Sequence, residues 1–124
     1  MRVLVCGSRH SDNYEVPKFI SILEEYPIET IISGEAKGFD TLAKIYAKAY
    51  NIAYEGYPAN WSKHGKAAGP IRNKQMLVEG KPDMVIAFLA KNSRGTANMI
   101  KQANEANIPV RIINIWNIDL IENF

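Results

Sequence analysis

Five short apolar runs alternate with segments whose apolar residues recur at helical spacing, and this alternation is the strongest constraint on the fold. Short runs rich in β-branched residues and bounded by turn residues are typical of buried strands. Strands that alternate with helices imply a parallel sheet with helices on both faces. At 124 residues, we predict one α/β domain over residues 1–124. The predicted strands are Arg2–Cys6, Thr30–Ser33, Ile52–Glu55, Met84–Phe88 and Pro109–Ile113.

The predicted helices lie between the strands, and residues at their ends mark where they start and stop. Ser11–Asn13 offers caps for the first helix, and Pro27 stops it. Another helix begins near Pro70 and ends at Gly80. The segment Ala59–Asn73 has no hydrophobic period, so we predict a long surface loop there that closes over an anionic small molecule.

Polar, glycine-rich segments follow the predicted strands, whereas the connections that precede the strands lack this composition. The polar segments are Gly7–Arg9, Gly34–Thr41, Pro58–Asn73 and Ser93–Thr96. In an open parallel α/β sheet, ligands bind outside the carboxyl ends of the strands. This asymmetry predicts the ligand site at that edge of the sheet.

Two of these segments have the composition of phosphate-binding turns. Gly34 and Gly38 allow a tight turn into a helix whose N-terminus favours an anion, although an ordinary strand–helix turn explains them about equally well. At Gly95 and Thr96, the backbone N–H groups and the threonine hydroxyl are predicted to hold a phosphate. In the alternative, Ser93 or Thr96 only caps a helix. Two such turns in one small sheet favour phosphate binding.

Four further side chains are candidates for the site, each with a simpler alternative. Arg72 can present its planar guanidinium to phosphate or carboxylate, or it is a solvated surface residue. Asp40 stabilises a helix N-terminus, or it binds ribose hydroxyls or acts as a general base. His64 either lies on the surface or binds phosphate and transfers a proton. Trp61 either covers the edge of the core or stacks on a base.

Charge and cysteine content exclude several classes of protein. A net charge of +2 is too small to indicate nucleic-acid binding, although five basic residues lie between Lys63 and Lys81 and suit a small anion. The single cysteine, Cys6, excludes an internal disulfide, and His10 and His64 lack ligand spacing, so we expect no metal and no cofactor. No apolar run approaches the ~18–20 residues that span a bilayer and no signal peptide begins the chain, so we expect a cytoplasmic protein without a membrane segment.

The C-terminal segment Asn114–Phe124 is rich in large apolar residues, among them Ile115 and Trp116. Such a segment is too apolar for a free tail and is expected to pack on the body or on a second subunit. We therefore predict a homo-oligomer, a dimer or larger.

Five motifs occur in order along residues 2–113. They are Val3–Arg9, Ser33–Asp40 with Leu42–Ala43, His64–Asn73 with Met76, Pro82–Asp83, and Ser93–Ala97. Together they resemble the YspA-like branch of the SLOG superfamily, which includes the LOG nucleotide phosphoribohydrolases and the DNA-processing protein DprA. The resemblance implies a Rossmann-like three-layer α/β/α sandwich with strand order 3-2-1-4-5 and a nucleotide or nucleotide-derived ligand at the switch point.

One position departs from the LOG pattern. LOG-type hydrolases carry Pro-Gly-Gly-x-Gly-Thr-x-x-Glu with a catalytic glutamate, whereas Met99 occupies the glutamate position here and the double glycine is missing. If this chain cleaves an N-glycosidic bond, Asp40 or Glu35 must serve as the acid instead. The resemblance places these residues at the site: Gly7, Ser8, Arg9, Gly34, Gly38, Asp40, Arg72, Asn73, Ser93, Gly95 and Thr96.

The sequence therefore predicts binding of a nucleotide, or of a relative of NAD or ADP-ribose. One hypothesis is an enzyme that cleaves the N-glycosidic bond, with Asp40 or Glu35 stabilising an oxocarbenium-like centre or activating water. The alternative is a non-catalytic sensor or sequestering module, which the missing glutamate favours. Binding of single-stranded nucleic acid is a third hypothesis, and the small net charge disfavours it.

Overall fold

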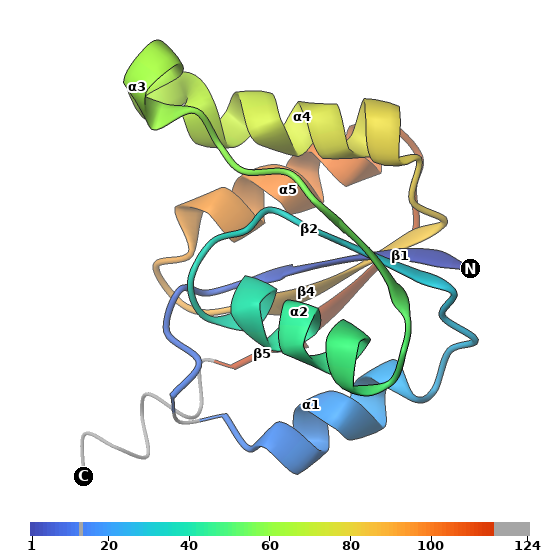
Figure 1. The fold of residues 1–124 in the computed structure, drawn as a ribbon. Coiled ribbons are helices and arrows are strands. Elements are labelled where there is room, and N and C mark those ends of the chain that lie inside the picture. The colour runs from blue at the N-terminus through green and yellow to red at the C-terminus, as the bar shows by residue number, and fades with distance from the viewer. Residues whose placement is uncertain (13, 116–124) are drawn as a thin grey trace, which may run out of the picture.

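A computed structural model of the chain describes residues 1–12 and 14–115. Five parallel strands form one sheet in the order β3-β2-β1-β4-β5, as the sequence predicts (Figure 1). This is a Rossmann-like α/β arrangement, with the order reversing beside β1. The strands are β1 (Arg2–Gly7), β2 (Thr30–Ser33), β3 (Ala53–Gly56), β4 (Met84–Leu89) and β5 (Val110–Asn114).

Helices cover both faces of the sheet, which gives three layers (Figure 1). One face carries α1 and α2 over a core that includes Val3, Val5 and Ile86. The other carries α4 and α5 over Leu4 and its neighbours. Because successive side chains of a strand point to opposite faces, a strand buried on both faces must be apolar throughout. The helices are α1 (Val16–Leu23), α2 (Phe39–Ala49), α3 (Trp61–His64), α4 (Ala68–Gly80) and α5 (Arg94–Glu105).

Aromatic packing fixes the end of β1 that leads into the predicted site. The rings of Phe39 and Phe88 stack with centroids 4.5 Å apart, and Tyr14 meets both edge-on. A Cβ atom at Gly7 would lie 2.8 Å from the Cβ of Phe88 and 2.9 Å from that of Phe39. Glycine at this position therefore lets α2 pack closely against the ends of β1 and β4.

The predicted loop at Ala59–Asn73 is wrong for most of its length. The chain forms α3, a 3₁₀ turn at Gly65–Ala67 and then α4. Asn60 caps α3, because its Oδ1 accepts the backbone N–H of Lys63 at 3.1 Å. Gly65 then adopts a left-handed φ of +56°, which separates α3 from the following turns. Local capping thus stabilises a short helix in a segment whose sequence shows no hydrophobic period.

The predicted start of α1 differs from the structure, whereas the predicted end of α4 is confirmed. The cap of α1 is Glu15, without a side-chain bond, and Pro17 lies in the first turn, so the Ser11–Asn13 prediction is wrong. Helix α4 ends at Gly80, and Lys81 follows it in the left-handed conformation. Gly80 stays in the helix, where an added Cβ would lie 3.2 Å from Cδ1 of Ile32.

The predicted packing of the C-terminal segment is observed for its first apolar residue. Ile115 is buried and belongs to the core beneath α1 and α2. Residues 116–124 lie outside the described part of the chain, and the homo-oligomer stays a prediction. Within the residues described, no helix combines the length and apolar character needed to cross a membrane.

Candidate functional site

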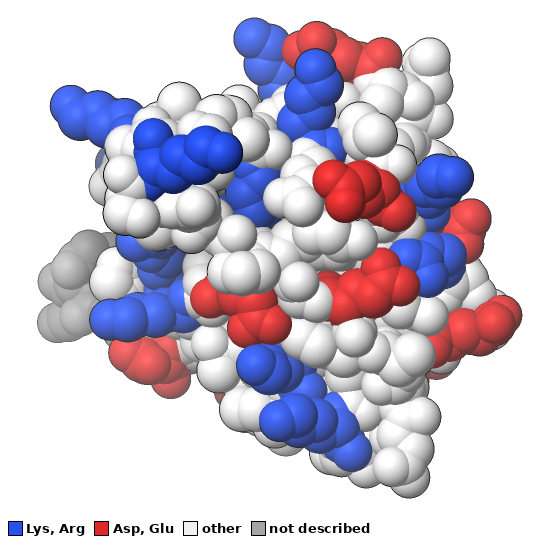
Figure 2. Space-filling model, turned by 45° about the horizontal axis from the view of Figure 1, so that its top comes forward, with Lys and Arg blue, Asp and Glu red and all other residues white. Residues whose placement is uncertain are grey.

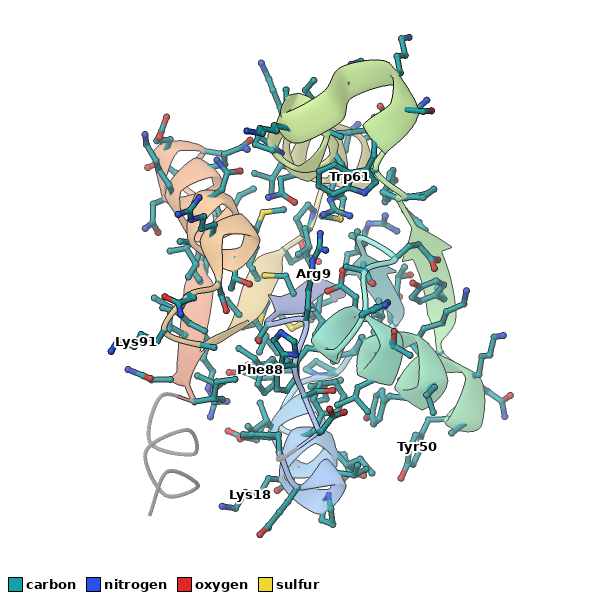
Figure 3. All side chains as sticks on the ribbon, turned by 90° about the vertical axis from the view of Figure 1, so that its left-hand side faces the viewer. Arg9, Lys18, Tyr50, Trp61, Phe88 and Lys91 are labelled. Atoms are coloured by element: carbon teal, nitrogen blue, oxygen red, sulfur yellow. The ribbon has the colours of Figure 1, made fainter. Side chains whose placement is uncertain are left out.

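A cavity of about 670 Å³ opens at the edge of the sheet where the strands end. It is lined by residues that follow β1, β2 and β4, by the first turns of α4 and α5, and by α3. Figure 3 views the molecule from this side. The location is the one predicted from the polar segments that follow the strands.

Most of the predicted site residues gather around this cavity. Four do not line it, namely Gly34, Glu35, Gly38 and His64. The residues that do line it are Gly7, Ser8, Arg9, Asp40, Trp61, Arg72, Asn73, Ser93, Gly95 and Thr96.

Two of the four residues outside the lining are glycines, Gly34 and Gly38, that let other parts of the cavity wall approach closely. Gly38 has a φ of +81°, and an added Cβ would collide with the carbonyl oxygens of Ser8 and Arg9. At Gly34 an added Cβ would collide with the guanidinium of Arg72. Both glycines therefore allow close approach between parts of the protein, and the left-handed backbone between them is at Glu35, with a φ of +62°.

Asp40 is a buried carboxyl group at the wall of the cavity. It is 5% exposed, and its Oδ2 accepts the backbone N–H of Ala36 at 3.1 Å. Burial raises the pKa of Asp40 to about 6, and the Ala36 hydrogen bond and the Arg72 charge act in the opposite direction. Asp40 therefore changes its charge close to neutral pH, which suits a group that exchanges protons or responds to an anion.

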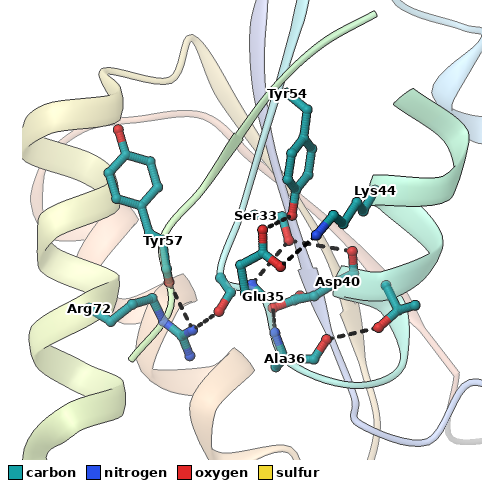
Figure 4. A network of polar contacts seen from close by, with 10 residues as sticks. Ser33, Glu35, Ala36, Asp40, Lys44, Tyr54, Tyr57 and Arg72 are labelled. Carbon is teal, nitrogen blue, oxygen red and sulfur yellow. Dashed lines mark hydrogen bonds and ion pairs between the residues drawn. The ribbon is translucent and has the colours of Figure 1, made fainter. Parts of the chain in front are cut away.

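Glu35 is held away from the cavity by two partners (Figure 4). Its Oε1 accepts the hydroxyl of Tyr54 at 3.0 Å, and its Oε2 pairs with Nζ of Lys44 at 3.2 Å. A carboxylate with two such partners is a poor candidate for the catalytic acid, which the LOG pattern places at the position that Met99 occupies here. Met99 itself is fully buried in the core under α5 and does not line the cavity.

Arg72 connects three parts of the site. Its Nη1 donates to the carbonyl oxygens of Gly34 and Tyr57 (Figure 4). Its Nε donates to Oδ1 of Asn73 at 3.1 Å. Its Nη2 has no hydrogen-bond partner among the described residues. Arg72 therefore has a fixed guanidinium with one nitrogen left for a ligand, and it is more than a solvated surface residue.

The guanidinium of Arg9 lies over the indole ring of Trp61, and both residues line the cavity (Figure 3). The guanidinium carbon of Arg9 lies 5.7 Å from the centroid of the indole ring, within the range of a cation–π contact. Trp61 is 49% exposed, so it does not bury the core edge as its simpler alternative required. Its ring offers a flat apolar surface at the rim.

The first turn of α5 lacks the side-chain cap considered for it. The hydroxyl of Ser93 accepts the backbone N–H of Ala90 at 3.1 Å and makes no bond to the helix N-terminus. Among the described residues, no side chain accepts the N–H groups of Gly95 and Thr96 at the positive end of the helix dipole. Thr96 is itself buried, and both residues line the cavity.

Several lining residues were not singled out from the sequence. Lys66, Lys91 and Arg94 add three positive charges, which with Arg9 and Arg72 oppose the single carboxyl group of Asp40. These residues follow strands, which is the one feature of the sequence that could have indicated them. A sequence does not distinguish a lysine or arginine that lines a cavity from one that is exposed in an ordinary loop. The other polar side chains missed here are those of His10, Asn92 and Asn98. In residues 1–12 and 14–115, no three His, Cys, Asp or Glu side chains cluster in a way that could hold a metal ion.

Comparisons with known proteins identify the family. The sequence profile of the YspA, cpYpsA-related SLOG family matches residues 1–64, from β1 through α3. The Gene 61 protein of Mycobacterium phage D29 is 35% identical over 85 residues, which are 64% of this chain and 67% of that protein. With the profile covering about half of the sequence, and with the sheet order that the resemblance implied, the chain belongs to the YspA, cpYpsA-related SLOG family.

Proposed function

We propose that the cavity binds a nucleotide-derived anion. The observation that carries this proposal is the charge of its lining, in which five Lys or Arg side chains oppose one carboxyl group. On a protein of net charge +2, this concentration of positive charge is local and lies in a concave site. A volume of about 670 Å³ is within the usual range for small-molecule sites.

The first turn of α5 is the proposed phosphate site. An added Cβ at Gly95 would meet no described atom within 4 Å, and Gly95 has no left-handed φ. Glycine in a helix costs roughly 1 kcal/mol relative to alanine, and no contact inside the protein requires it at this position. Close approach of a phosphate to an uncapped helix N-terminus supplies a reason for glycine there.

The Arg9–Trp61 pair is the proposed contact for the base. A purine or pyrimidine ring stacking on Trp61 would gain favourable contact area, and Arg9 is placed to cover its edge or neutralise a phosphate. The two proposed subsites lie in one cavity, so a single nucleotide-derived molecule could occupy both.

Cleavage of the N-glycosidic bond is a second candidate activity, favoured by the position of Asp40. In that reaction, Asp40 would take a proton from water as the water oxygen bonds to C1′ of the ribose. The bond from C1′ to the base breaks, and the base leaves with its electron pair and takes up the proton that Asp40 received from the water, directly or through solvent. The raised pKa of Asp40 suits a group that gains and releases a proton near neutrality.

Binding of single-stranded nucleic acid has less support. The face shown in Figure 2 carries acidic and basic side chains side by side, without a continuous basic strip across it. A polymer that depends on phosphate contacts needs such a strip. The cavity instead confines its positive charge to the space of a small molecule.

The test is a panel of AMP, dAMP, GMP, NAD and ADP-ribose, measured by calorimetry for binding and by mass spectrometry for released base. Binding of at least one compound with a 1:1 stoichiometry is expected. Base release that disappears in Asp40→Ala, while binding persists, would establish the N-glycosidase. Binding with every compound recovered intact would identify a sensor or sequestering module. Absence of binding across the panel would contradict the proposal.

A further inference from the structure

We propose that the side-chain amide of Asn98 donates a hydrogen bond to an acceptor oxygen of the ligand and helps select it. The inference rests on the proposed function of the cavity and adds a residue that lies outside the sequence motifs singled out above. Asn98 lies on α5 one turn beyond its start, is partly buried, and lines the cavity.

A chain of hydrogen bonds fixes which end of the Asn98 amide faces the protein. It begins at Arg72, whose Nε can only donate and does so to Oδ1 of Asn73 at 3.1 Å. The Nδ2 group of Asn73 must then face away, and it donates to the Gly95 carbonyl at 3.2 Å and to Oδ1 of Asn98 at 3.1 Å. A donor at the start of the chain thus sets the orientation of each amide that follows.

Gln102 reinforces the same orientation from the other side. Its Nε2 donates to Oδ1 of Asn98 at 2.7 Å and to the carbonyl of Pro70 at 3.1 Å. The oxygen of Asn98 therefore accepts two hydrogen bonds, one from α4 and one from its own helix. Turning the amide over would place its nitrogen against two donors, which is unfavourable.

The remaining group of Asn98 is its Nδ2, which has no hydrogen-bond partner among the described residues. Its side chain borders a cavity in which five of the other lining side chains are cationic donors. A neutral donor held in a fixed direction contributes selectivity, because a ligand without an acceptor at that point leaves the N–H unpaired. Lysine and arginine side chains at the rim attract anions less selectively.

Matched substitutions separate this role from a structural one, with ADP-ribose and AMP as separate probes in calorimetry. Asn98→Leu removes the donor and the acceptor, and Asn98→Asp keeps an acceptor oxygen but replaces the donor. Asn92→Asp adds the same charge to the lining and measures the effect of charge alone. Gln102→Leu removes one hydrogen bond to Pro70 of α4 and one to Asn98 of the same helix, and Gln102 lies outside the lining of this cavity.

We expect Asn98→Leu to weaken binding at least tenfold, and Asn98→Asp to weaken it several times more than Asn92→Asp does. Gln102→Leu is expected to lower the melting temperature about as much as Asn98→Leu, with a clearly smaller loss of affinity. Equal losses of affinity in Asn98→Leu and Gln102→Leu would show that Asn98 has only a structural role. Unchanged affinity in both Asn98 variants would also overturn the inference and leave the proposed function intact. A wild-type protein that binds neither probe would contradict both.

Discussion

Replacing Arg72 with alanine is expected to raise the dissociation constant of the nucleotide-derived ligand by one to two orders of magnitude. A hydrogen bond to a charged group contributes roughly 1.5–3 kcal/mol. Arg72 lines the cavity, and its Nη2 makes no hydrogen bond to the described residues, so we propose that it donates one to the ligand. The substitution also removes the hydrogen bonds that hold Gly34 and Asn73 in position. Calorimetric titration with ADP-ribose and AMP measures the loss.

Lys74→Ala is the matched control, because Lys74 is an exposed cation on the same helix but does not line this cavity. Its affinity is expected to stay within a factor of two of the wild type. Arg72→Lys keeps the charge without the planar fork, and we expect it to recover only part of the affinity. Equal affinities in Arg72→Ala and Lys74→Ala would remove Arg72 from the site.

Replacing Asp40 with asparagine is expected to stabilise the protein at pH 7.5. Burial raises the pKa of Asp40 from 3.8 to about 6, so the folded state holds this proton more tightly than the unfolded state does. The contribution to the free energy of unfolding is therefore fully present below pH 4 and is lost as the pH rises to about 6. A difference of this size corresponds to about 3 kcal/mol, and asparagine can still accept the Ala36 N–H.

Urea unfolding of the wild type and Asp40→Asn at pH 4.5, 6 and 7.5 checks this expectation. The variant should gain about 1 to 3 kcal/mol over the wild type between the lowest and the highest pH. Other carboxyl groups titrate in both proteins, so only the difference between them reports on Asp40. A constant difference across the three pH values would contradict the raised pKa.

The same titration bears on ligand binding. Among the described residues that line the cavity, Asp40 carries the only negative charge. Its protonation removes that charge, so ADP-ribose is expected to bind more tightly at pH 5 than at pH 7.5. ADP-ribose is suitable because its diphosphate lacks the terminal phosphate group that titrates in AMP. His10 also lines the cavity, so both proteins carry His10→Gln in this comparison. In Asp40→Asn the pH dependence should disappear.

The sequence predicts the fold well because its central strands, β1 and β4, are buried on both faces. Continuous apolar runs such as Met84–Phe88 have few alternatives, and each observed strand lies within one residue of its predicted limits. The helix α3 is missed because four residues show no period and depend on the Asn60 cap. The alternation of strands and helices thus predicts the layers of the fold, whereas local hydrogen bonds determine whether a short helix such as α3 forms.

The location of the site could be predicted from the sequence, but the direction of its side chains could not. The polar segments that follow the strands converge because parallel strands end at one edge. Which of two acids faces the cavity depends on the left-handed backbone at Glu35 and on its partners Lys44 and Tyr54. The orientation of Asn98 depends on a relay that begins 26 residues earlier, at Arg72, and no sequence period encodes it.

Binding of a nucleotide-derived ligand in the cavity can be tested by mapping backbone amide shifts in ¹⁵N-labelled protein titrated with ADP-ribose and, separately, with AMP. We expect the largest changes on residues around the cavity, with Gly7, Ser8, Gly95 and Thr96 among them. Saturating changes at these amides would place a nucleotide-derived ligand at the carboxyl ends of the strands. Changes confined to the α4–α5 groove near Val78 and Ala106, or no change with either compound, would contradict it.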